Sequence, residues 1–264
     1  MDWEALFQQW VASLVRTNAY YVPKGATKKQ WDESALNKAH NLREKLEAQA
    51  RTILSNRTLT DVGWLIKSLK GILPEQKQKQ GFIISSLRQA TQIPDALLEP
   101  LLKASLFTDP SSNSAYIGPC LRCFGPRKVN EILFRHFEKG TNEEKTGAAN
   151  GFYWALRNFH TRSLRLGLVP HENINDLHVK VRYAFLTTFL RNEDVPLRRS
   201  LIARITQADF TRSEYPKDTQ TLLRQVLRIA RSHSDEYIRY RVSITPPGEV
   251  TTYKPLPKQN RNKC

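Results

Sequence analysis

The chain has 264 residues, of which 40% are hydrophobic, so it can bury a sizeable core and is neither a fibrous nor a low-complexity protein. Lysine and arginine number 41 against 25 aspartates and glutamates, which gives a formal net charge of +16. An excess of this size favours a partner with negative charge, such as an acidic protein, a nucleic acid or an anionic membrane surface.

The sequence contains no signal for secretion or for crossing a membrane. It begins Met1-Asp2-Trp3-Glu4, which lacks the basic region and apolar core of a signal peptide. No stretch approaches the roughly 18 apolar residues that a membrane span needs. The cysteines number 3, and an odd number argues against a disulfide framework and for a reducing compartment. We therefore expect a cytoplasmic location.

Helical periodicity starts near the N-terminus and continues along most of the chain. Apolar residues spaced by threes and fours predict helices over residues 2–16 and 30–55, which together suggest an N-terminal helical cap of residues 1–56. Further helices are predicted over residues 62–73, 76–91, 94–106, 115–124, 127–139, 142–159, 176–191, 194–208, 217–232 and 234–243. No strand-like alternation of any length is present, so the predicted fold class is all-α.

The predicted helical region ends in a segment of different composition. Residues 57–245 are expected to form one repeat domain, interrupted by an irregular stretch over 160–175 that contains Gly167 and Pro170. Residues 246–264 are rich in proline and lysine and contain little that is apolar. Because such a segment cannot offset the entropy of ordering, we expect a basic, disordered tail.

A short pattern recurs in the helices: an apolar residue, a basic residue, then small and apolar residues. It is found in the segments 144–148, 181–184, 197–201 and 238–242. A repeated helical unit cannot close one compact core, so the units are expected to stack and to leave a long continuous surface. A related match places glycine two residues after lysine at Gly81 and at Gly147, which predicts close helix crossings at these positions.

These patterns resemble the HEAT-repeat superfamily, and more narrowly bacterial proteins of that type. The likeness rests on Asp194-x-x-Leu197-Arg198, on Asp176 with Val181-Arg182, and on Asp235-Glu236-x-Ile238-Arg239. It covers roughly residues 60–243 and implies an α-solenoid of about five stacked antiparallel helix pairs. It also implies that three arginines form a structural ladder and pair with acids of neighbouring units: Arg182, Arg198 and Arg239.

Arginines crowd the last third of the chain. Arg224, Arg228 and Arg231 are spaced i, i+4, i+7 and share one face of a helix. The guanidinium group is suited to bidentate contact with carboxylate or phosphate. We therefore predict a partner-binding surface made of Arg199, Arg204, Arg224, Arg228, Arg231, Tyr237, Tyr240 and Arg241. The competing interpretation of the arginine stripe is an ordinary solvated helix face.

No set of residues points to catalysis, to a metal, to a cofactor or to a small-molecule site. The six histidines form no His-Glu-x-x-His pattern, and no glycine-rich phosphate loop or nucleophile elbow is present. Cys120-x-x-Cys123 has no second cysteine pair, so plain burial is favoured over zinc binding. In Ser232-His233-Ser234-Asp235 the serine or aspartate before the helix is better explained as an N-cap than as part of a catalytic set.

Two functions remain open, and a third, a repeat-type lyase or chaperone that acts on a small cofactor, has no specific support in the sequence. The first is a non-enzymatic scaffold that binds an acidic macromolecular partner, preferably a protein. The alternative is a nucleic-acid-binding protein, including an enzyme similar to the DNA glycosylases that use HEAT-like repeats. Trp154, Arg157 and Asp176 are the residues considered for the latter role, but they cannot be aligned with the motif of that family.

Overall fold

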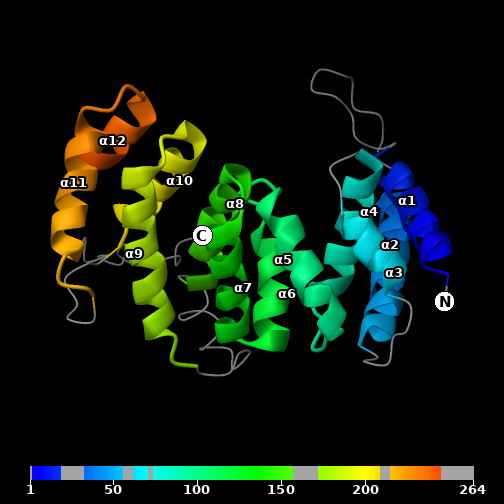
Figure 1. Cartoon of the computed structure of the whole chain (residues 1–264). Coiled ribbons are helices and arrows are strands. Elements are labelled where there is room, and N and C mark those ends of the chain that lie inside the picture. Colours follow the sequence, from blue (N-terminus) through cyan, green and yellow to red (C-terminus); the bar gives the residue numbers. More distant parts are fainter. Residues whose placement is uncertain are drawn as a thin grey trace, which may run out of the picture. The chain divides into compact units, whose positions relative to one another are not determined.

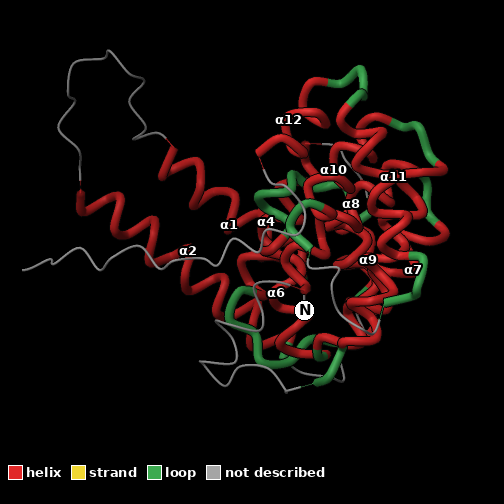
Figure 2. The backbone as a smooth tube through the Cα atoms, turned by 90° about the vertical axis from the view of Figure 1, so that its left-hand side faces the viewer, coloured by secondary structure: helices red, strands yellow, loops and turns green. Residues whose placement is uncertain are grey.

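The structure is a computed structural model and describes residues 2–18, 33–55, 62–70, 74–156, 172–208 and 215–244. Every regular element in these ranges is a helix, and Figure 2 shows no strand among them. The all-α prediction is therefore confirmed for this part of the chain. None of the described helices combines the length and the apolar character needed to cross a bilayer.

The chain divides into two compact units, Met1–Ile174 and Asn175–Cys264. The first unit contains α1 (Trp3–Asn18), α2 (Glu33–Leu54), α3 (Gly63–Leu69), α4 (Pro74–Leu87), a 3₁₀ turn (Asp95–Leu97), α5 (Leu98–Leu106), α6 (Ser114–Phe124), α7 (Pro126–Lys139) and α8 (Asn142–Phe152). The second contains α9 (Asn175–Arg191), α10 (Val195–Ile205), α11 (Thr219–Arg231) and α12 (Glu236–Ile244). Each predicted helix overlaps one of these elements. The predicted boundary at residues 56 and 57 stays a prediction, and the tail 246–264 and most of 160–175 lie outside the described residues.

An aromatic cluster packs α1 against α3 and α4 within the first unit. Figure 2 shows α1 and α2 side by side, and α4 packs against both of them and against α3. Trp3, Phe7 and Trp10 are 2%, 2% and 6% exposed, because their spacing puts all three on one helix face. The ring of Trp10 lies 5.6 Å from that of Phe82 on α4, and the ring of Trp3 stacks on that of Trp64 of α3 at 6.2 Å. Such contacts contribute about 0.5–1.5 kcal/mol per pair beyond area burial.

One charged pair lies at the edge of this cluster. The Lys79 ammonium is 2.9 Å from Glu4 Oε2 and 5.5 Å from the ring centroids of both Phe7 and Trp64. Gln8 Nε2 donates to Glu4 Oε1 at 2.8 Å, and Trp64 Nε1 donates to Glu4 Oε2 at 2.9 Å. Hydrogen bonds from Gln8, Lys79 and Trp64 lower the pKa of Glu4 to about 2. The bond to Glu4 also raises the pKa of Lys79, so the pair is charged over a wide pH range.

The second half of the first unit is built around α5, which packs against α3, α6, α7 and α8. The α5–α8 crossing is close, since a Cβ placed on Gly147 would lie 2.0 Å from the carbonyl oxygen of Leu106. The predicted close crossing is thereby confirmed at Gly147. It is wrong at Gly81, where the nearest atom to such a Cβ is a Trp10 ring carbon at 3.8 Å.

The second unit consists of two helical hairpins, α9–α10 and α11–α12, shown from yellow-green to orange in Figure 1. The first helices of the two hairpins, α9 and α11, pack against each other, and so do the second helices, α10 and α12. Its core includes Phe189, Leu197, Val226 and Ile238, each fully buried at 0% exposure. The two hairpins therefore contact each other through equivalent helices.

We expect Gly147→Ala to destabilise the protein by about 1–3 kcal/mol, because the added methyl group meets backbone atoms that cannot move aside cheaply. Gly81→Ala is the matched control. It has room for the methyl group and should be neutral or stabilising by up to about 1 kcal/mol, since alanine favours helix over glycine. Urea denaturation of both variants tests this, and equal midpoints for the two would contradict the close crossing.

The lowered pKa of Glu4 predicts a defined pH dependence of stability. A carboxyl group whose pKa is lowered in the folded state stabilises the fold above its unfolded value of 4.5, and this contribution is lost as the pH falls towards 2. Because Glu4 is 44% exposed, the free energy of unfolding of the wild type should exceed that of Glu4→Gln by about 1 kcal/mol or less. Urea unfolding at several pH values should show the difference at pH 7 and its disappearance at pH 2. When Lys79 is replaced by Met in both proteins, the difference in unfolding free energy between them should become smaller. A difference that does not change with pH would show that the ionisation of Glu4 is not its cause.

Candidate binding surface on the second unit

The two hairpins of the second unit share one turn design. Asp194 precedes α10, and its carboxylate accepts a hydrogen bond from the Leu197 amide at 2.8 Å. Asp235 precedes α12 and accepts from the Ile238 amide at 3.1 Å. Both are N-cap interactions, which satisfy an amide that has no partner within its helix. The N-cap interpretation of Asp235 is thereby confirmed.

The arginine four residues after each cap reaches back over its turn. Arg198 is 9% exposed, and its Nε donates to the carbonyl oxygens of Phe189 at 3.2 Å and Asn192 at 2.8 Å. Arg239 Nη1 donates to the carbonyl oxygens of His233 and Ser234, the latter at 2.7 Å. Cationic donors near a helix C-terminus stabilise its last carbonyl groups. The two arginines therefore brace their own hairpins through backbone carbonyls, a role that the expected ladder of acid pairs does not describe.

Further contacts between the hairpins come from other side chains. Arg199 donates to Asp235 Oδ2 from Nη2 at 2.6 Å and from Nε at 3.0 Å. This bond lowers the pKa of Asp235 and raises that of Arg199. Arg241 Nη2 donates to the Ala203 carbonyl at 3.5 Å, and Arg182 Nη1 donates to the Tyr215 hydroxyl at 3.2 Å. Arg199, one position after Arg198, thus forms an arginine–acid pair between the hairpins.

The predicted arginine stripe lies on the exposed side of α11. Arg224, Arg228 and Arg231 are exposed, whereas Val226 and Ala230 are buried at 0% exposure. Arg224 donates to the carbonyl of Gln220 and the hydroxyl of Thr221 within its own helix. Among the described residues none of the three arginines forms an ion pair. Their charges are therefore presented to solvent.

Aromatic side chains adjoin this stripe on α12, where Tyr237 and Tyr240 are 42% and 57% exposed. A shallow hollow of about 550 Å³ joins the two helices and is lined by Arg231, Glu236, Arg239, Tyr240, Val242 and Ser243. It brings together Arg231 and Tyr240, two of the predicted binding residues, with Arg239. We call Arg224, Arg228, Arg231, Tyr237 and Tyr240 the arginine–tyrosine surface.

The remaining predicted residues are half-buried or are already bound to an acid of the chain. Arg204 on α10 and Arg241 on α12 are half-buried, and Arg199 is bound to Asp235. Of the residues considered for a glycosylase-like role, Trp154 is half-buried and donates to the Pro110 carbonyl at 3.1 Å. Arg157 lies outside the described residues. Asp176 is exposed in the first turn of α9.

The two cysteines of the Cys-x-x-Cys motif differ in burial. Cys120 is 0% exposed, and burial raises the pKa of its thiol well above the usual range. Cys123 Sγ donates to the Ala90 carbonyl at 3.7 Å. In the described part of the chain no three histidine, cysteine or acidic side chains gather as a metal site. The predicted burial is therefore confirmed for Cys120, whereas Cys123 is half-buried.

Sequence reasoning identified no small-molecule site, yet the first unit contains a cavity of about 640 Å³. Its lining residues come from α3, α4, α5 and α6 and from the segment after α5. Because they are scattered over about 50 positions with no fixed spacing, no motif could have identified them.

Comparison with known proteins finds no matching family, no matching curated protein and no matching solved structure. The resemblance to HEAT repeats therefore rests on the motifs of the chain and on the packing of its helices.

We expect Arg198→Met to weaken the α9–α10 hairpin by about 1–3 kcal/mol, because the carbonyl groups of Phe189 and Asn192 lose their buried donor. Arg224→Met, at an exposed position, should change stability by no more than about 0.5 kcal/mol. Hydrogen exchange of residues 186–202 measures the local effect. Equal protection in the two variants would contradict the bracing role of Arg198.

Proposed function

We propose that the protein is a non-catalytic helical-repeat scaffold that binds an acidic macromolecular partner through the arginine–tyrosine surface. The partner we propose is a protein. The observation that carries this proposal is a contrast within one unit. Arg198, Arg199 and Arg239 are bound to carbonyl or carboxylate groups of the chain. The three arginines of α11 project from one exposed helix face with no ion pair among the described residues. They remain available to a partner's carboxylates.

The charge balance of α11 and α12 supports an acidic partner. Residues 219–244 include five arginines and two acidic residues, and one of the acids, Asp235, is engaged by Arg199. Arginine and tyrosine are also the residue types enriched at energetic hot spots of protein interfaces. An acidic protein segment lying along α11 would meet guanidinium groups first and the exposed tyrosine rings of α12 beside them.

The repeated turn supports a HEAT-like architecture. Asp194 and Asp235 are 41 positions apart, which falls within the 40–47 residue period of HEAT and armadillo repeats. In both units, each helix packs extensively only against helices that are at most the third before or after it along the chain. Packing confined to near neighbours is what a repeat protein requires. The proposed architecture is an α-solenoid of about five helix pairs.

Nucleic acid is the second candidate partner, because the same guanidinium groups can contact phosphates and the exposed tyrosines can stack on bases. Glu236 makes this partner the weaker choice. Its side chain lines the same hollow as Arg231 and Arg239 and would repel a phosphodiester chain. A protein can place a basic side chain opposite Glu236, and this favours a protein partner.

A charge-reversal triple, Arg224→Glu with Arg228→Glu and Arg231→Glu, tests the surface. Its control is Lys38→Glu with Lys45→Glu and Lys139→Glu, which makes the same change in net charge at exposed positions of the first unit. We expect the α11 triple to lose at least about 10-fold in affinity for labelled poly-glutamate, because repulsion replaces attraction at three contacts. The control should stay within about threefold of the wild type.

Fluorescence anisotropy with poly-glutamate and with mixed-sequence duplex DNA distinguishes the two partners. If the protein binds DNA and not poly-glutamate, and log affinity falls against log salt concentration with a slope of about −0.9 per neutralised phosphate, the partner is a nucleic acid and not a protein. Wild-type affinity for both probes in the α11 triple would show that binding uses another face. Circular dichroism should show that helical content is retained in both triples.

A further inference from the structure

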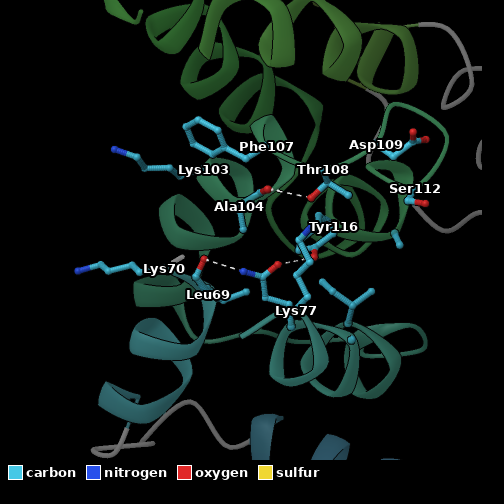
Figure 3. Close-up of a pocket in the computed structure, with 14 residues that line it drawn as sticks. Leu69, Lys70, Lys77, Lys103, Ala104, Phe107, Thr108, Asp109, Ser112 and Tyr116 are labelled. Atoms are coloured by element: carbon cyan, nitrogen blue, oxygen red, sulfur yellow. Dashed lines mark hydrogen bonds between the residues drawn. The ribbon is translucent and has the colours of Figure 1, made fainter. Parts of the chain in front are cut away.

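The first unit encloses a cavity that is independent of the arginine–tyrosine surface. Its volume is about 640 Å³, and α3, α4, α5 and α6 all contribute side chains to it (Figure 3). Small-molecule sites in proteins usually range from about 300 to 1,000 Å³. The cavity is therefore large enough to hold an organic molecule.

The walls of the cavity are largely apolar. Ile84 of α4, Ala104 of α5 and Ala115 of α6 line it together with Phe107, the residue that follows α5. Phe107 is 40% exposed, although a phenyl group of this size gains about 1.5–3 kcal/mol when it is fully buried. A hydrocarbon placed against Phe107 would remove that surface from water.

The polar groups deep in the cavity satisfy each other. The Tyr116 hydroxyl donates to Gln80 Oε1 at 3.1 Å, and Gln80 Nε2 donates to the Leu69 carbonyl at 3.3 Å. Tyr116 and Gln80 are each 7% exposed, and burial raises the pKa of Tyr116, so its phenol is neutral. A ligand therefore meets no buried charge in the interior of the cavity.

Charge is confined to the rim and is unevenly placed. Lys70, Lys77 and Lys103 are exposed and line the cavity, and in Figure 3 Lys70 and Lys103 extend to the same side. Asp109 is the one acidic residue in the lining and lies on the opposite side of that view. Its carboxylate accepts hydrogen bonds from the amide and hydroxyl of Ser111, which lower its pKa. Lys103 Nζ lies 3.6 Å from Glu144 Oε1, an ion pair of small energetic weight because the lysine is exposed, whereas Lys70 forms no ion pair among the described residues. The lysine side of the rim is therefore the attractive end for an anion, with Lys70 as its unpaired charge.

We propose that this cavity binds a small organic anion with an apolar body, whose acidic group lies between Lys70 and Lys103 and whose hydrocarbon part lies against Phe107 and Ile84. A neutral apolar ligand would make no use of the lysine end. A small inorganic anion would leave the apolar walls in contact with water. A carboxylate on an aliphatic chain satisfies both ends of the cavity, so the ligand class is a fatty-acid-like carboxylate.

The test uses the full chain and three probes: decanoate, its neutral analogue decanol, and acetate, which carries the acidic group alone. Isothermal titration calorimetry should show decanoate binding about 10-fold more tightly than decanol, a difference of 1.4 kcal/mol. Acetate should not bind at millimolar concentration. Equal affinities for decanoate and decanol would overturn the proposal. So would the absence of decanoate binding at 1 mM, which would mean a binding free energy weaker than about −4 kcal/mol.

Two variants locate the binding site. The double variant Lys70→Gln with Lys103→Gln should remove the preference for decanoate over decanol and leave decanol binding unchanged. Its control is Lys67→Gln with Lys128→Gln, at exposed positions outside the lining, which should keep the preference for decanoate. Ala115→Trp fills the cavity from an exposed position and should weaken both ligands at least about 10-fold. Unchanged decanoate affinity in Ala115→Trp, with the helical spectrum retained, would place binding elsewhere and refute the site.

Discussion

The second unit depends on how Arg198 binds the end of the preceding helix. The last carbonyl groups of a helix have no partner within it, and a buried helix end needs donors from elsewhere. The planar guanidinium of Arg198 supplies them to Phe189 and Asn192, and its Nη1 lies 3.3 Å from His233 Nε2 of the second hairpin. Its plane also lies over the Phe189 ring, with the central carbon 5.2 Å from the ring centroid. One side chain thus sets the α9–α10 turn and contacts the next hairpin.

Much of this arrangement could be predicted from the sequence, because helix periodicity is a local property. The spacing of Arg224, Arg228 and Arg231 opposite Val226 and Ala230 requires one exposed and one buried face whatever packs on α11. The partners of the arginines were not predictable in the same way. Successive helix residues point about 100° apart, so whether Arg198 or Arg199 meets an acid depends on how the next hairpin is rotated. That rotation is a result of packing and leaves no pattern in the sequence.

The two glycines and the cavity show the same limit. Gly81 and Gly147 have the same local sequence context, yet only Gly147 lies against a backbone, because α5 passes over it. The cavity needs side chains from four helices whose mutual positions no periodicity encodes. The charged groups at the two proposed sites also differ in kind. Guanidinium groups on α11 suit paired, planar contacts with carboxylates, whereas the ammonium groups around the cavity act as point charges at the mouth of an apolar space.

The repeated turn also explains why an apolar side chain is exposed at the end of α12. Aligning Asp194 with Asp235 pairs Arg198 with Arg239, Ile202 with Ser243 and Ala203 with Ile244. Ile202 and Ala203 are 0% and 7% exposed because the second hairpin packs on the first, but Ile244 is 48% exposed. Among the described residues no third hairpin follows α12 to cover the equivalent positions. Ile244 follows Ser243, which lines the same hollow as Arg231 and Tyr240. A partner that covers this end of α12 would therefore also remove the apolar side chain of Ile244 from water.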